Sequence, residues 1–147
     1  MLDACRDLGI AFVAFSPLAR GYLTGTLRDV NAFEPADIRR HMPRFSEEYY
    51  PRNLTLLRLI EQIAKEEGCT LAQLALVWLL NQGDNIIPIP GTTSLDHLNE
   101  NIKAMDFALS SHSMRRLDQI INNTAVMGER YNSATQSEID TEEFAAA

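Results

Sequence analysis

The residues best placed to do chemistry form a short hydroxyl cluster after an apolar run. The run Ile86–Pro90 is followed by Gly91 and then by Thr92, Thr93 and Ser94. Glycine allows a close approach of the backbone to a ligand, and Ser94 is a suitable N-cap for a helix from about Leu95. Free amides at a helix start, with hydroxyls beside them, are typical of an anion site, most often for phosphate. The same pattern also fits a simple helix cap, so both interpretations remain open.

A second polar loop with comparable chemistry follows the apolar run Ile10–Phe15. This loop, Ser16–Gly25, contains a proline, two glycines and several hydroxyls. Both apolar runs are too short for helices and are bounded by glycine or proline, which predicts two short buried strands. Pro88 and Pro90 restrict the second strand further, because proline cannot donate to a sheet ladder.

Helical segments separate the two predicted strands and follow them. The first helix should end near Leu8, before Gly9, and Thr26–Pro51 reads as a long loop with one helical turn. Apolar residues at helical spacing predict an amphipathic helix over Asn53–Glu67 that ends at Gly68. A mostly apolar helix should run from Leu71 to about Asn81 with Thr70 as its cap, and a later one should begin at Ser110 or Ser111.

Two buried strands separated by helices predict parallel βα units, with helices on both faces of the sheet. Two strands do not close a sheet, and unpaired edges on apolar strands promote aggregation. The pattern therefore predicts a piece of a larger α/β fold.

The composition is that of a single soluble domain. The chain has 147 residues, of which 46% are hydrophobic and 22% charged, and its formal net charge is −7. This acidic balance argues against a nucleic-acid partner. One basic group, Arg39, Arg40, His41 and Arg44, is flanked by acidic residues, which favours a solvated loop over a binding patch.

The cysteines and the N-terminus indicate a reducing, non-membrane setting. Cys5 and Cys69 form neither a CxxC motif nor a Cys/His cluster, so we expect no disulfide framework and no metal site. The first residues lack a signal-peptide pattern, and the longest apolar run, Leu74–Leu80, is far below the ~20 residues of a membrane span. We expect a cytoplasmic protein without a membrane partner.

Three motifs together resemble the aldo-keto reductase family. They are Gly9–Gly25, Ala72–Leu80, and Ile87–Thr93 followed by Glu100-Asn101. The likeness runs to about Tyr131, so residues 1–131 are interpreted as one C-terminal segment of the family's barrel. Residues 132–147 are then a polar tail that we expect to be partly disordered.

The resemblance implies a fold, a reaction and a set of binding residues. Members fold as a (β/α)8 TIM barrel and reduce aldehydes or ketones with NADPH, without a metal, and this chain looks like the seventh and eighth strands with their helices. The cofactor lies at the carboxyl ends of the strands. The family positions that hold the cofactor pyrophosphate match Ser16, Leu18, Arg20, Gly21 and Leu23. Those that hold the adenosine ribose and its 2′-phosphate match Gly91, Thr92, Thr93 and His97. Those that contact the adenine match Glu100 and Asn101.

One matched position departs from the family pattern. His97 stands where many members carry an arginine for the 2′-phosphate of NADP. Arginine is a permanent bidentate phosphate partner, whereas histidine is charged only in part near neutral pH. NADH is therefore an alternative cofactor, and His97 as a solvent-facing helix residue is an equal alternative.

The family's catalytic Asp, Tyr, Lys and His have no counterpart in this chain. Tyr22, Tyr49, Tyr50 and Tyr131 are interpreted as packing or loop residues, and His41 and His112 as surface residues. Phe33, Phe45 and Tyr49 are candidates either for a substrate pocket or for local packing. Three interpretations follow. The chain is a cofactor-binding segment of a reductase whose N-terminal half supplies the acid, or a truncated, non-catalytic nucleotide-binding or interaction module, for example a homo-oligomer, or a defunct fragment that does not fold well alone.

Overall fold

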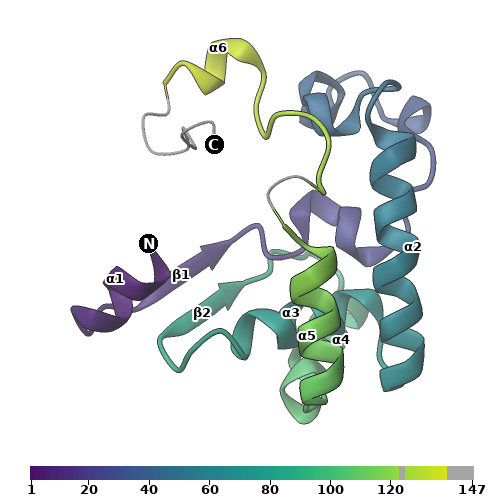
Figure 1. Cartoon of the computed structure of the whole chain (residues 1–147). Helices are drawn as coiled ribbons and strands as arrows, with labels where there is room; N and C mark the ends of the chain where they lie inside the picture. The colour runs from purple at the N-terminus through teal and green to yellow at the C-terminus, as the bar shows by residue number, and fades with distance from the viewer. Residues whose placement is uncertain (123–124, 139–147) are drawn as a thin grey trace.

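Helices separate the two strands and follow the second one, as the sequence predicts (Figure 1). A computed structural model of the chain describes residues 1–122 and 125–138. The main elements are α1 Leu2–Asp7, β1 Phe12–Phe15, α2 Tyr50–Glu67, α3 Leu71–Leu80, β2 Ile86–Ile89, α4 Leu95–Lys103, α5 Ser111–Ile120 and α6 Ser133–Gln136. Short 3-10 turns lie between them: η1 Ala19–Thr24, η2 Val30–Ala32, η3 Ile38–His41, η4 Pro43–Phe45 and η5 Ala104–Asp106.

The two strands form a parallel pair, as predicted. Phe12 lies opposite Ile86 and Phe15 opposite Ile89, so both strands end at the same edge of the sheet. The first strand is shorter than its apolar run, because the side chain of Asn85 donates a hydrogen bond to the carbonyl of Ile10 in place of a ladder partner. The loop after β1 and the turn after β2 therefore leave the sheet side by side.

The expectation that both faces of the sheet are buried is wrong for the described chain. Ala14 and Ile86 are buried on one face, and α3 packs against β2. The opposite face is about half exposed at Val13, Phe15, Ile87 and Ile89. Side chains alternate across a strand, so covering one face leaves this second row of apolar side chains open.

A core between α2, α3 and α5 fixes the helices beside the sheet. Leu57, Ile63, Leu74 and Leu117 are almost completely buried there. The predicted boundaries hold because their signals are local: α2 ends at Gly68 with φ 70°, and Thr70 with Gln73 forms a capping box at the start of α3. Ser110 caps α5 by accepting from the backbone N–H of Ser113.

The long loop before α2 is more ordered than predicted. It contains three 3-10 turns rather than one helical turn, and α2 begins at Tyr50 instead of Asn53. Pro51 lies in the first turn of α2, where a missing N–H costs nothing. Phe33 and Phe45 pack with Tyr50 in a second apolar cluster, which answers the open question about these two phenylalanines in favour of local packing.

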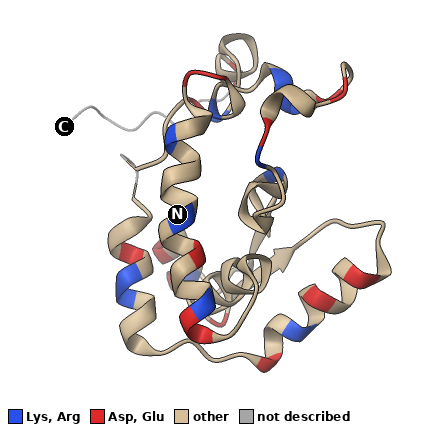
Figure 2. Ribbon diagram, turned by 90° about the vertical axis from the view of Figure 1, so that its right-hand side faces the viewer, with Lys and Arg blue, Asp and Glu red and all other residues tan. Residues whose placement is uncertain are grey.

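Charged residues are interspersed along α1, α2, α4 and α5, while α3 and the two strands carry none (Figure 2). Across the described ranges, every helix is too short or too polar to cross a bilayer.

Cys5 and Cys69 are both free thiols. The predicted polar tail contains the short helix α6, and its residues 139–147 lie outside the described residues. The boundary at residue 131 stays a prediction.

Candidate functional site

A cavity of about 520 Å³ opens at the edge where both strands end. It lies between the loop after β1, the turn after β2, α3 and α4. Most of the residues that the sequence nominates for a cofactor line it, namely Ser16, Leu18, Arg20, Gly21, Gly91, Thr92, His97, Glu100 and Asn101. Leu23 instead packs against the main apolar core, and Thr93 is exposed in the turn next to the cavity.

The loop after β1 has an unusual backbone. Ser16, Ala19 and Arg20 all have positive φ, between 49° and 55°, and Gly21 follows with φ 90°. Each non-glycine residue in this region costs about 1–3 kcal/mol and persists only where its surroundings enforce it. Hydrogen bonds from the N–H of Ala19 to the carbonyl of Ser16 and from the N–H of Leu23 to the carbonyl of Leu18 fold the loop on itself. Such strain is concentrated at functional sites.

Arg39 is a cavity residue that the sequence argument missed. Its Nη1 donates a 3.0 Å hydrogen bond to the carbonyl of Arg20, and its guanidinium lies 4.4 Å from the ring centre of Phe33. Nε donates to both carboxylate oxygens of Asp37, and this hydrogen bonding lowers the Asp37 pKa. The solvated-loop prediction is thus wrong for Arg39. No local signal reveals this, because its partner Arg20 is 19 residues away in the sequence.

The turn after β2 leads directly into α4. Ser94 is the N-cap, as predicted, and its hydroxyl accepts from the backbone N–H of His97. The hydroxyl of Thr92 accepts from the N–H of Ser94 at 3.1 Å, which tightens the turn. Glu100 and Asn101 lie three and four residues after His97, so one side of the helix presents all three to the cavity.

Asn101 is the strongest sign that the cavity suits a polar ligand. Only 9% of the residue is exposed, and it lines the cavity wall. Among the described residues, its amide atoms are not buried atoms without a partner, so they are open to solvent in the cavity. A ligand with a donor and an acceptor can therefore reach the amide of Asn101.

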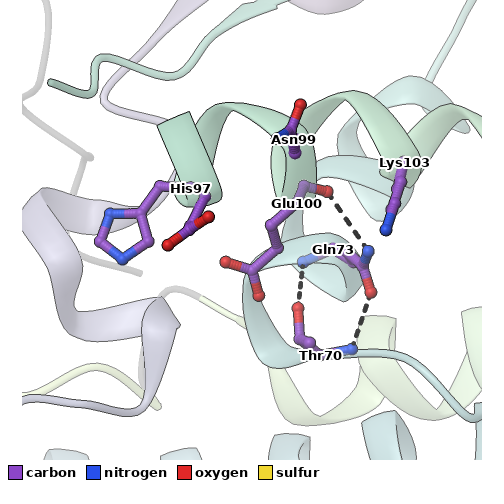
Figure 3. A pocket seen from close by; sticks show the side chains of 7 residues that line it. Thr70, Gln73, His97, Asn99, Glu100 and Lys103 are labelled. Carbon is purple, nitrogen blue, oxygen red and sulfur yellow. Dashed lines mark hydrogen bonds between the residues drawn. The ribbon is translucent and has the colours of Figure 1, made fainter. Parts of the chain in front are cut away.

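An open recess of about 480 Å³ adjoins the cavity along α4 and shares His97 and Glu100 with it. Figure 3 shows its wall, in which the amide of Gln73 joins the cap of α3 to α4. Gln73 Nε2 donates to the carbonyl of Glu100 at 3.2 Å, and its Oε1 accepts from the N–H of Thr70. The position of Glu100 therefore depends on the start of α3.

The cavity wall carries cationic, carboxylate and hydroxyl groups that suit the binding of a polar ligand. Two guanidinium groups, from Arg20 and Arg39, face several hydroxyls, and among the described lining residues there is no tyrosine or lysine. Tyr22 donates its hydroxyl to the carbonyl of Asn53, and burial raises its pKa, which confirms a packing role. His41 and His112 are exposed, as predicted. In the part of the chain that the structure describes, no three metal-ligating side chains gather.

Comparison with known proteins gives one consistent result. The model of the aldo/keto reductase family matches residues 1–122. The chain is 40% identical over 139 residues to the aldo-keto reductase yakc [NADP(+)] of Schizosaccharomyces pombe, covering 95% of this chain and 41% of that protein. It is 35% identical over 130 residues to the aldo-keto reductase str7 of Strobilurus tenacellus, covering 88% and 39%.

Solved structures agree with the sequence relatives. A thermostable aldo-keto reductase, Tm1743, solved with the inhibitor epalrestat, is 32% identical with a TM-score of 0.55, covering 82% of this chain and 33% of that one. The glycerol dehydrogenase AKR11B4 from Gluconobacter oxydans superimposes with a TM-score of 0.74 at 22% identity, over 84% and 40%, which supports the fold alone. The present fold is accordingly part of a TIM barrel, and the chain spans about two fifths of the curated relatives it matches.

Proposed function

Because the chain belongs to the aldo/keto reductase family, we propose that it is the cofactor-binding C-terminal portion of an NAD(P)H-dependent reductase of aldehydes or ketones. The observation that carries this proposal is the cavity at the common end of β1 and β2. Its walls come from loops more than seventy positions apart in the sequence, and they unite residues that match the family's cofactor positions.

Different residues of the cavity would bind different parts of the proposed cofactor. The folded loop with Ser16, Arg20 and Gly21 would hold the pyrophosphate, with Leu18 and Leu23 as its apolar support. Gly91, Thr92, Thr93 and His97 would face the ribose and 2′-phosphate, and Glu100 with Asn101 would contact the adenine. The amide of Asn101, on the cavity wall, fits the donor and acceptor edge of a base. The bound nicotinamide would supply the hydride.

NADP is the cofactor we favour, with NAD as the alternative. The relative from Schizosaccharomyces pombe carries NADP(+) in its name. His97 gives the 2′-phosphate no permanent charge, but Arg39 supplies a permanent guanidinium in the same cavity. The choice between the two nucleotides depends on how far Arg39 compensates for His97.

The acid for carbonyl reduction would come from outside this chain. Reduction needs a group that protonates the carbonyl oxygen as charge develops there. Within the described cavity wall, Arg20, Arg39, His97 and Glu100 are the ionisable groups, and none matches the family's tetrad. We propose that an N-terminal barrel half supplies these residues, in a reducing compartment such as the cytoplasm, which suits the free thiols.

A non-catalytic interaction module is the second candidate. Besides the open face of the sheet, α4 and the turn after it carry exposed apolar residues at helical spacing: Leu95, Leu98, Ile102 and Met105. Apolar surface of this kind is typical of interfaces. Either the other barrel half or a second copy of the chain would cover it.

Two asparagines on α4 provide a matched test of the proposed site. Asn101 lies in the cavity wall, whereas Asn99 is exposed and lines only the adjoining recess. Nicotinamide fluorescence of NADPH should report saturable binding to the wild-type chain. We expect Asn101→Ala to raise the Kd about tenfold, in line with the loss of one hydrogen bond to the ligand, and Asn99→Ala to leave it unchanged. Equal effects of both substitutions would exclude the cavity as the binding site.

A further inference from the structure

One buried side chain connects the C-terminal segment to the loops around the cavity. We call residues 125–131 the strap. Asn53, in the first turn of α2, is only 3% exposed. Its Nδ2 donates 3.0 Å hydrogen bonds to the carbonyls of Arg44 and Met127, and its Oδ1 accepts from the N–H of Met127 at 2.9 Å. Three hydrogen bonds thus engage the amide of Asn53, and two of them hold the backbone C=O and N–H of Met127 in the strap.

The strap is fitted closely against the loop before α2. In Figure 1 it is the yellow-green segment after α5 that passes beside the blue turns. Gly128 has φ 83°, and a Cβ there would come within 2.9 Å of the carbonyl carbon of Pro43 and of the ring of Tyr49. Arg44 Nε donates to the carbonyl of Gly128 at 3.1 Å. Only glycine allows this approach of two backbones.

The same contacts reach the loop after β1 from two sides. On one side, the hydroxyl of Tyr22 donates to the backbone carbonyl of Asn53. On the other side, the guanidinium of Arg20 lies 5.3 Å from the ring centre of Tyr131, at the end of the strap. Arg130 lies 4.6 Å from the ring centre of Phe15, the last residue of β1. Strap and loop therefore share Asn53 at one point and the Arg20–Tyr131 contact at another.

We propose that Asn53 is a positioning residue that couples the strap to the loop Ser16–Gly25, so that nucleotide affinity depends on whether the strap is docked. This inference rests on the proposed function of that loop. The left-handed backbone at Ser16, Ala19 and Arg20 persists only while surrounding contacts enforce it. Releasing the strap removes Tyr131 from Arg20 and Arg130 from Phe15, and it leaves the Asn53 side chain without its partners at Met127. The cavity then loses its preformed shape.

Three substitutions in the full chain test this coupling. Asn53→Ala removes the amide. Gly128→Ala displaces the strap while every residue of α2 stays unchanged, which covers the case in which the first variant does not fold. Gly68→Ala is the matched control, because Gly68 also has a positive φ of 70° but no atom within 4 Å of an added Cβ. Hydrogen exchange is measured by mass spectrometry without nucleotide, and the Kd of NADPH by fluorescence.

We expect Asn53→Ala and Gly128→Ala to speed exchange about tenfold in residues 125–131 and also in residues 16–25, with α3 unchanged. The same variants should raise the Kd of NADPH about tenfold, and Gly68→Ala should change neither quantity. Faster exchange confined to the strap would overturn the coupling. Failure of NADPH to bind the wild-type chain would refute the nucleotide site instead, while the exchange comparison without nucleotide still decides whether strap and loop are coupled.

Discussion

Arg39 illustrates how a single residue changes the chemistry of the cavity. Its guanidinium is oriented by Asp37 and Phe33 and bonded to the carbonyl of Arg20, so its charge is held in place at the wall. A positioned guanidinium recognises phosphate better than a flexible ammonium does. Because Asp37 pairs with Arg39, Arg39 offers a phosphate an oriented hydrogen-bond donor rather than an unpaired cation.

His97 is the residue that should set the choice between NADPH and NADH. We predict that His97→Arg lowers the Kd of NADPH about tenfold and leaves the Kd of NADH unchanged, because arginine adds a permanent partner for the 2′-phosphate alone. Parallel fluorescence titrations with the two nucleotides measure this directly, with NADH as the internal control. An equal gain for both nucleotides would mean that position 97 does not face the 2′-phosphate.

At the scale of the elements, the sequence predicts features that depend on neighbouring residues and misses those that depend on distant contacts. The caps at Thr70, Ser94 and Ser110 and the stop at Gly68 were predictable, because each depends on neighbours within one turn. The roles of Arg39 and Asn53 were not, because their partners lie 19 and 74 residues away. The cavity residues were nominated through family resemblance, and spacing alone left the phosphate interpretation open.

The order of the long loop depends on Asp37, which both caps η3 and pairs with Arg39. Asp37→Asn keeps the capping oxygen but removes the charge. We predict a loss of about 0.5–1 kcal/mol in the free energy of unfolding at pH 7, as expected for a partly exposed ion pair. Urea unfolding of the wild type and of Asp37→Asn measures this difference in the free energy of unfolding.

The pH dependence of that difference follows from the lowered pKa of Asp37. A carboxyl whose pKa is lower in the folded state stabilises the fold above its unfolded pKa of about 4, and this contribution disappears as the pH falls through the folded value. Wild type and Asp37→Asn should therefore begin to converge in stability as the pH falls below about 4, and the charge contribution should vanish only below the lowered folded pKa of Asp37. A difference that persists undiminished at low pH would show that the charge is not responsible.

At the scale of the whole molecule, the open sheet face is the dominant feature. Val13, Phe15, Ile87 and Ile89 form a half-exposed apolar surface on two strands with free edges. Burial of such a surface is worth about 25 cal/mol per Å². The chain should therefore associate with itself, or with the remaining part of a barrel when that part is present.

We predict that the double substitution Val13→Thr and Ile87→Thr weakens self-association about tenfold, because it removes apolar surface while keeping β-branched side chains. Leu59→Gln is the control, since Leu59 is comparably exposed at 49% but lies alone on α2. Sedimentation velocity over a concentration series gives the association constants. A wild-type chain that stays monomeric, or an equal effect of Leu59→Gln, would remove the sheet face as the interface.

Titration of the purified wild-type chain with NADPH, followed by nicotinamide fluorescence with the oligomeric state measured in the same buffer, tests the central claim most directly. Our account predicts saturable binding with one nucleotide per chain, because the cavity residues are already assembled at the ends of β1 and β2. A folded chain that binds neither NADPH nor NADH would contradict the account and leave the interaction module as the better description.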